Sequence, residues 1–452
     1  MKKILLAVAC CAMNLLAQAN PAHKVKINDG LTVSVEACSE SIFRIKVSPR
    51  KDFTESLMER YELIKTDWSE VKTDISDKGG VWTLKTPEYS LAINKKTGVM
   101  TVKDSKGGKV IREVRFLPEK EGLCGEMRSF INEKYADLKV ADNGGGIIGD
   151  DNGKFGEVDK HEIPAADAVS ILSISMEDGE RFYGGGSTSR DHIQHRGEFL
   201  RMWTTYQQTE IPMPFMMSSG GWGVYNNSTR KSFFDIGNRR KDRFNIVNTF
   251  DEADFFLMMG KDMPAILNEY TLVTGRTYVL PKWAYGLCFG PNMREEQFDI
   301  LNDAVRFRQF DVPCDVFWLE PQWMEKRYDF STKKKWNYDR FSPEPYWLQD
   351  QYPKTMHNRL FIGKLRSMGF HLGLWLCEEY DLSIQEEDII AERTGGKLSG
   401  QEHWMDHLTV FMDQGVEGFK LDPARTIDNH TNWEYYNGRT DKEMHNLNQV
   451  LL

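Results

Sequence analysis

Three short segments decide the fold: CDVFWLE (314–320), LGLWLCEE (372–379) and VEGFKLD (416–422). Each is an apolar run of strand length that ends in one or two carboxylates, at Glu320, Glu378 with Glu379, and Asp422. Because the carboxyl ends of the strands in a β/α barrel face the active site, acidic residues at three such ends predict a catalytic site. The alternative, that each acid caps a following helix, explains one such residue better than three.

Segments with helical spacing of apolar residues separate these strands, and a shorter apolar run at Tyr285–Phe289 precedes them. The helices are predicted at Glu295–Gln309, Asn358–Met368 and Trp404–Gln414. Strands that alternate with helices indicate a parallel sheet. We therefore predict that residues 274–452 form part of a (β/α)8 TIM barrel. A complete barrel takes about 250 residues, so later strands, and a second catalytic carboxylate, are expected beyond Leu452.

The preceding region, residues 20–273, has the alternating pattern of β-strands and predicts a β-sandwich. A hairpin is expected where Leu91–Ile93 and Val99–Val102 flank a turn that contains Gly98. The glycine-rich acidic stretch 143–157 predicts an exposed loop. No helix is expected before Met263–Leu272, where Asp262 can cap the first turn. The whole is therefore a multidomain chain, with an N-terminal β-sandwich followed by a partial barrel.

Residues 1–19 have the layout of a secretory signal peptide. Two lysines precede an apolar run that is too short to span a bilayer, and the small residues Ala17 and Ala19 occupy positions −3 and −1 of a cleavage site after Ala19. A lipoprotein cysteine at Cys10 is the alternative, but few apolar residues precede it. We therefore predict a periplasmic or secreted protein with no membrane span in the mature chain.

Composition excludes several function classes. The net charge of −9 and the lack of a long basic cluster argue against nucleic-acid binding. The odd number of widely spaced cysteines after residue 19 fits neither a zinc site nor a disulfide framework, and those in predicted strands are expected to be buried. His403 and His407 lie one helical turn apart but lack a third ligand, so we predict no metal and no cofactor. The sequence does not indicate an oligomeric state.

Several motifs, in the correct order, resemble glycoside hydrolase family 31. They are YGGG (183–186), IPMPFMMSS (211–219), GWGVY (221–225), LPKWAYG (280–286) and the second and fourth barrel strands that end at Glu320 and Asp422. Any one of these motifs is weak evidence, but together they cover roughly residues 181–422. The resemblance implies a retaining α-glycosidase whose partner is a carbohydrate substrate.

The resemblance also implies roles for particular residues. Asp422 matches the catalytic nucleophile, and Lys420 matches the lysine that precedes it by two residues. Glu320 stands where the family usually carries an aspartate that binds sugar hydroxyls. Trp375 matches a tryptophan of the substrate subsite, and Trp323 is a further substrate-binding candidate that could instead belong to the core.

Three departures from the family pattern concern sugar recognition: Glu320 replaces aspartate, Trp203 is followed by Thr204, Thr205 and Tyr206, and Pro423 follows the nucleophile position. The sequence therefore leaves the sugar open. It also leaves an alternative from another class, a secreted carbohydrate-binding protein whose barrel has lost its catalytic function.

Overall fold

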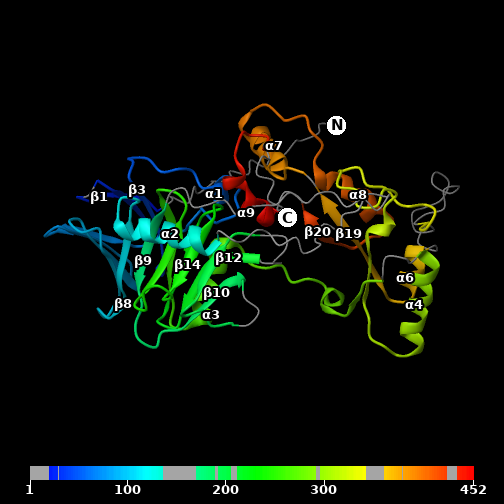
Figure 1. The fold of residues 1–452 in the computed structure, drawn as a ribbon, viewed down its shortest axis with the longest axis horizontal. Helices are drawn as coiled ribbons and strands as arrows, with labels where there is room; N and C mark the ends of the chain where they lie inside the picture. Colours follow the sequence, from blue (N-terminus) through cyan, green and yellow to red (C-terminus); the bar gives the residue numbers. More distant parts are fainter. Residues whose placement is uncertain are drawn as a thin grey trace, which may run out of the picture.

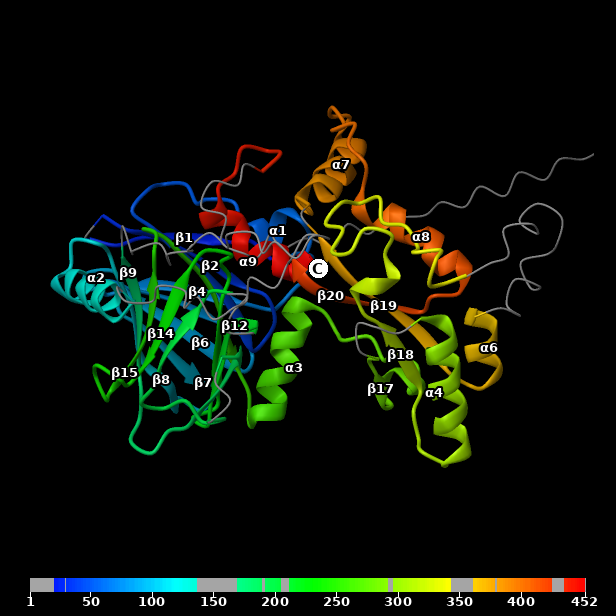
Figure 2. The same ribbon diagram turned by 45° about the vertical axis from the view of Figure 1, so that its right-hand side comes forward.

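The computed structural model describes residues 20–28, 30–135, 169–188, 192–204, 211–291, 296–342, 361–378, 380–424 and 435–451. Two layered sheets and a strand–helix region lie side by side along the longest axis of the molecule (Figure 1). Helix α9 (Asp441–Leu451) lies between them in both views (Figures 1 and 2). The predicted signal peptide and the predicted loop at 143–157 lie outside the described residues.

The first sheet has seven antiparallel strands. In spatial order they are β1 (His23–Lys26), β2 (Thr32–Ala37), β3 (Ile42–Ser48), β16 (Ala253–Met259), β13 (Trp222–Asn226), β12 (Ile211–Ser218) and β10 (Phe182–Ser187). Strand β3 thus pairs with β16, which lies more than 200 residues further along the chain.

The second sheet has nine antiparallel strands. In spatial order they are β11 (Phe199–Met202), β14 (Ser232–Ile236), β15 (Arg243–Asn248), β9 (Ser170–Ser175), β8 (Lys109–Leu117), β7 (Met100–Asp104), β6 (Tyr89–Asn94), β5 (Val81–Lys85) and β4 (Asp74–Lys78). The predicted hairpin is confirmed, because Leu91 of β6 pairs with Val102 of β7.

One continuous apolar core lies between the two sheets. Alternate side chains of each strand point inward, such as Phe43 and Ile45 of β3 from one sheet and Leu91 and Ile93 of β6 from the other, and all four are fully buried. This alternation is what two half-buried sheets require, and it confirms the predicted sandwich.

Three helices accompany the sandwich: α1 (Leu57–Arg60), α2 (Gly122–Tyr135) and α3 (Met263–Thr274). Helix α3 begins as predicted, since the Asp262 carboxylate accepts a hydrogen bond from the Ala265 amide. It packs on the first sheet through a stacked Tyr270–Phe215 pair with ring centroids 3.9 Å apart. The expectation that no helix precedes it was wrong. Helix α2 covers the outer face of the second sheet, where Cys124, Met127 and Ile131 pack against residues of β8, β9, β14 and β15.

The barrel region contains a four-stranded parallel sheet in sequential order. Its strands are β17 (Cys288–Phe289), β18 (Val316–Leu319), β19 (His371–Glu378) and β20 (Gly418–Ala424). Its longer helices are α4 (Gln297–Gln309), α6 (Phe361–Ser367), α7 (Ser383–Thr394) and α8 (Trp404–Gln414). The predicted partial barrel is thus confirmed, and α8 has the predicted bounds.

The first barrel strand differs from its prediction. Lys282–Tyr285 form a 3-10 turn, so only Cys288 and Phe289 pair with β18. Because β17 lies at the edge of the sheet, Cys288 is exposed, although it was predicted to be buried. Cys314 and Cys377 are buried as predicted.

The sandwich and the barrel region meet at a junction of polar contacts. The Arg60 guanidinium at the end of α1 pairs with both oxygens of Glu387 on α7, at 2.9 and 2.7 Å. The Tyr61 hydroxyl donates to the same carboxylate at 2.8 Å, and Asn437 donates to it at 3.2 Å. A cation and two neutral donors therefore hold one partly buried carboxylate between the two parts.

Helix α9 completes this junction. The Thr229 hydroxyl donates to the Glu443 carbonyl at 2.6 Å. His445 Nε2 lies 2.7 Å from the Thr204 carbonyl, so this nitrogen carries the proton. The imidazole also stacks on Trp203, with ring centroids 4.0 Å apart. Helix α9 therefore binds the sandwich directly after β11.

Candidate active site

The register of the parallel strands arranges their residues in layers. Trp318 of β18 pairs with Gly373 of β19, which pairs with Gly418 of β20. Paired residues on neighbouring strands point to the same face, so these three form one layer. The opposite face carries Phe317, Leu374 and similar side chains, which pack among the helices. The layer of Trp318 therefore faces the interior of the barrel.

The two glycines of this layer make room for the indole of Trp318. A Cβ atom at position 373 would overlap the Trp318 ring, and one at position 418 would lie 3.0 Å from it. Neither glycine has a positive φ, so close approach of the ring, and not backbone conformation, is what requires glycine here. The ring forms the layer beneath the carboxyl ends of the strands. Sequence reasoning missed Trp318, although its spacing of two residues from Glu320 could have indicated it.

We expect Gly373→Ala to lower the free energy of unfolding by about 1–3 kcal/mol, because overpacking forces a rigid ring from its place. Thermal or denaturant unfolding measures this loss. Gly125→Ala, in helix α2 with open space around the new methyl group, is the matched control. It should be neutral or stabilising, by up to about 1 kcal/mol. Equal stability of the Gly373→Ala variant and the parent would contradict the described packing.

The next layer, two residues further along each strand, contains three of the predicted site residues. Lys420 pairs in register with Trp375, and Glu320 directly follows β18. Lys420 Nζ lies 3.6 Å from Glu320 Oε1. The lysine side chain is 45% exposed and the glutamate 26%, so this charged pair is open to a ligand from solvent. The structure thus brings these residues together at the carboxyl ends of the strands.

The two predicted tryptophans are both buried. Trp323 is fully buried and donates its indole N–H to the Trp375 carbonyl at 2.7 Å. Trp375 is 3% exposed, and the ring of Tyr328 packs edge-to-face against it at 5.5 Å. For Trp323, the structure corresponds to the core alternative. Neither ring therefore offers an open face to a sugar.

Tyr328 is a second residue that sequence reasoning missed. Its φ of 54° lies in the left-handed region, which is unfavourable for a bulky side chain. Conformations of this kind cost of the order of 1–3 kcal/mol and cluster at functional sites. Tyr328 covers Trp375, and the Arg327 guanidinium lies 4.8 Å from its ring centroid. No sequence pattern indicates such a backbone conformation.

Asp422 lies in β20, directly after the last residue that pairs regularly with β19. Leu376 pairs with Leu421 and Glu378 with Ala424, so β20 carries one extra residue at this point. Such a bulge bends a strand and is common next to active sites. It also accommodates Pro423, which cannot donate a hydrogen bond to a neighbouring strand. Glu379 lies outside the described residues.

The histidines that could suggest metal binding have other partners. His403 Nε2 contacts the Asp388 carboxylate at 2.9 Å, and His407 Nδ1 lies 3.6 Å from Glu402. Across the ranges that the structure describes, no group of His, Cys, Asp and Glu could hold a metal ion. Within the same ranges, no helix has both the length and the apolar character needed to cross a lipid bilayer.

Both parts of the chain match models of known protein domains. Residues 32–235 match the N-terminal galactose mutarotase-like domain of glycosyl hydrolase family 31, and residues 277–452 match the TIM-barrel domain of that family. The chain belongs to glycoside hydrolase family 31. The predicted boundary at residues 273–274 falls at the end of α3, between the two matched regions.

Individual relatives are distant. An α-xylosidase of Emericella nidulans is 23% identical over 68% of this chain, and one of Lactiplantibacillus pentosus is 24% identical over 60%. A family 31 dextranase structure from Flavobacterium johnsoniae superposes with a TM-score of 0.66, over 96% of this chain at 17% identity. The chain spans 41% and 38% of the two α-xylosidases and 52% of the dextranase structure.

Proposed function

We propose that this protein hydrolyses α-glycosidic bonds and that its substrate binds at the carboxyl ends of β18 to β20. The observation that carries the proposal is the contact between Glu320, which follows β18, and Lys420 of β20 at 3.6 Å. Lys420 lies two residues before Asp422 on the same strand. Enzymes of this fold bind their substrates at the carboxyl ends of the barrel strands, and this exposed ion pair lies there. Membership of family 31 supports the choice of an α-glycoside.

We propose a retaining double displacement with Asp422 as the nucleophile. Its carboxylate attacks the anomeric carbon, the bond to the leaving oxygen breaks, and a second acid protonates that oxygen. That second residue then removes a proton from a water molecule, whose oxygen attacks the anomeric carbon and breaks the bond to Asp422, so the sugar leaves with its original configuration. The attack requires an ionised carboxylate, and a nearby cation favours that form. Lys420 is the candidate for this cation. We assign no residue to the acid and base step.

Trapping tests this mechanism against the carbohydrate-binding alternative. A 5-fluoro-α-glycosyl fluoride should label the protein, and digestion followed by mass spectrometry should place the added sugar on the peptide that contains Asp422. A binding protein without a nucleophile acquires no such label. Labelling on a different carboxylate would overturn the assignment of Asp422 and leave the glycosidase proposal in place.

Glu320 should select the sugar. Its carboxylate reaches Lys420, and shortening it to aspartate moves the oxygens by about one carbon–carbon bond. Sites that hydrogen-bond a hydroxyl discriminate strongly, because the wrong epimer leaves buried polar groups unpaired. We expect Glu320→Asp to change the ratio of kcat/KM values among aryl α-xyloside, α-glucoside and α-galactoside by about tenfold or more.

The control for this experiment is Glu269→Asp on α3, which is outside the site and should leave the ratios unchanged. A uniform decrease on every substrate would show that Glu320 has a general structural or catalytic role. The substrate panel also identifies the preferred sugar. Relatives named α-xylosidase favour testing the xyloside first. The layout of residues 1–19 supports our further proposal that the protein is periplasmic or secreted.

A further inference from the structure

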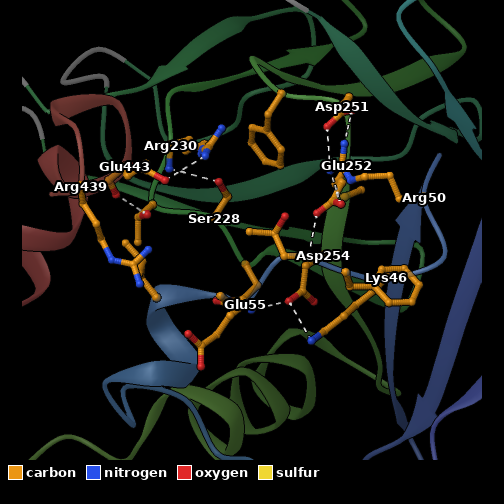
Figure 3. A pocket seen from close by; sticks show the side chains of 18 residues that line it. Lys46, Arg50, Glu55, Ser228, Arg230, Asp251, Glu252, Asp254, Arg439 and Glu443 are labelled. Carbon is orange, nitrogen blue, oxygen red and sulfur yellow. Dashed lines mark hydrogen bonds and ion pairs between the residues drawn. The ribbon is translucent and has the colours of Figure 1, made fainter. Parts of the chain in front are cut away.

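A separate cavity of about 160 Å³ lies on the sandwich side of the junction (Figure 3). Its walls come from the segment between β3 and α1, the turns after β13 and β15, and the start of α9. None of its lining residues belongs to β17, β18, β19 or β20. The cavity is therefore distinct from the candidate active site.

The charges that line the cavity nearly balance. Five carboxylates and four basic groups surround it: Glu55, Asp251, Glu252, Asp254 and Glu443, with Lys46, Arg50, Arg230 and Arg439. Several pair with each other, as do Arg50 with Asp251 at 2.6 Å and Arg230 with Glu443 at 3.1 Å. A strongly charged ligand of either sign would meet repulsion. A neutral ligand with many hydrogen-bonding groups fits this lining better.

Two lining residues have unused hydrogen-bonding capacity. Asn227 is 4% exposed, and its amide nitrogen donates to Asp254 Oδ2 at 2.8 Å, which fixes the orientation of the amide. Its Oδ1 is buried and has no partner within the described part of the chain. The same holds for Nε of Arg439. Buried polar groups without a partner are unfavourable and call for an explanation.

Sugar hydroxyls match both groups in kind, because a hydroxyl can donate to an amide oxygen and can accept from a guanidinium N–H. Two half-buried aromatic rings, Phe53 and Phe250, line the same cavity. The C–H faces of a pyranose pack against aromatic rings, while planar amide, carboxylate and guanidinium groups bind its hydroxyls. The cavity volume of about 160 Å³ gives space for several water-sized groups, which is the scale of one sugar ring.

We propose that this cavity is a second, non-catalytic saccharide site that binds one neutral pyranose unit of a glycan. The choice of a sugar as ligand rests on the proposed glycosidase function, whereas the site uses none of its residues. A glycan held here would be anchored at the junction of the two parts of the protein, beside α9.

Direct binding tests the proposal in a chain that cannot turn over its ligand. Maltotriose and methyl α-D-xyloside are titrated against the Asp422→Asn chain by calorimetry and by saturation-transfer NMR. Phe53→Ala and Arg439→Ala are added separately, and Arg306→Ala on α4, outside the cavity, is the matched control. We expect Kd at the second site to rise at least tenfold in both cavity variants and to stay unchanged in the control. Thermal melting checks that each variant is folded.

Identical binding isotherms in all four proteins, or no saccharide binding outside the active site, would overturn the proposal. If Arg439→Ala fails to fold, Phe53→Ala still tests the proposal, because Phe53 is partly exposed and its replacement should not prevent folding. Kinetics on aryl α-glycosides with Asp422 intact separate the two hypotheses. Hydrolysis without binding in the cavity refutes the second site alone, and binding in the cavity without hydrolysis refutes the glycosidase proposal alone.

Discussion

Replacing Asp422 with asparagine should lower kcat by about 10⁴ or more in any form of this enzyme that hydrolyses an α-glycoside. The amide has nearly the size of the carboxylate but cannot attack the anomeric carbon, so no glycosyl-enzyme forms. Because the change is almost isosteric, the melting temperature should change little. Initial rates on an activated aryl α-glycoside measure the effect, since such a substrate depends least on protonation of the leaving group.

The control for this variant is Asp315→Asn. Asp315 immediately precedes β18, at the opposite end of the strand from Glu320, and a neutral residue there should leave kcat within about twofold, the scale of a ~0.4 kcal/mol change. A residual kcat above about a tenth of the parent value for Asp422→Asn would show that the nucleophile lies elsewhere.

Glu387→Gln should lower the free energy of unfolding by about 2–4 kcal/mol. The Glu387 side chain is only 12% exposed and holds Arg60, Tyr61 and Asn437 at the junction. Removing one charge of a buried pair leaves its partner uncompensated, which costs up to about 3–5 kcal/mol. The side chain of Arg60 is 27% exposed, and this partial solvation reduces the loss. Denaturant unfolding at pH 7 measures it.

The same contact predicts a pH dependence. Hydrogen bonds from the Arg60 guanidinium outweigh burial and lower the pKa of Glu387 from 4.5 to about 2. A depressed pKa stabilises the folded state above the pKa of the unfolded chain, and this stabilisation is lost as the pH falls from about 4.5 towards 2. The parent protein should therefore lose more stability across this window than Glu387→Gln does.

Glu386→Gln on the same helix is the matched control for this second prediction. Burial raises the pKa of Glu386, so neutralising it should cost less than about 0.5 kcal/mol. Equal losses in the two variants would mean that the charge of α7, and not the contact with Arg60, stabilises the junction.

Local sequence patterns predicted the elements whose cause is local. Strands with one buried face alternate with period two, and the Asp262 carboxylate caps α3 within a single turn. Helix α8 shows its amphipathic spacing clearly, and its predicted bounds match. Helix α2 was missed although Cys124, Met127 and Ile131 have helical spacing, because Gly122 and Gly125 lower the helix propensity of its first turns.

The features that the sequence could not reveal depend on contacts between distant segments. Glu320 and Lys420 are about 100 residues apart in the chain, so no local pattern indicates their contact. The family motifs, and not periodicity, identified both residues. Nothing local indicates that Tyr328 covers Trp375 or that Trp318 lies across two glycines. The lining of the cavity beside the junction has the same origin, since Asn227 and Arg439 lie far apart in the sequence and line it together only after folding.

The junction also has a consequence for the order of events on the ribosome. Its hydrogen bonds join residues 241 positions apart at Thr204–His445 and 376 apart at Tyr61–Asn437. At about 5–20 residues per second, the sandwich is synthesised many seconds before α9 emerges, and it can fold during that interval. Its surface beside β11 is then exposed to solvent until α9 arrives. Arrested nascent chains should therefore show protease sensitivity at Trp203 that disappears once α9 has been released.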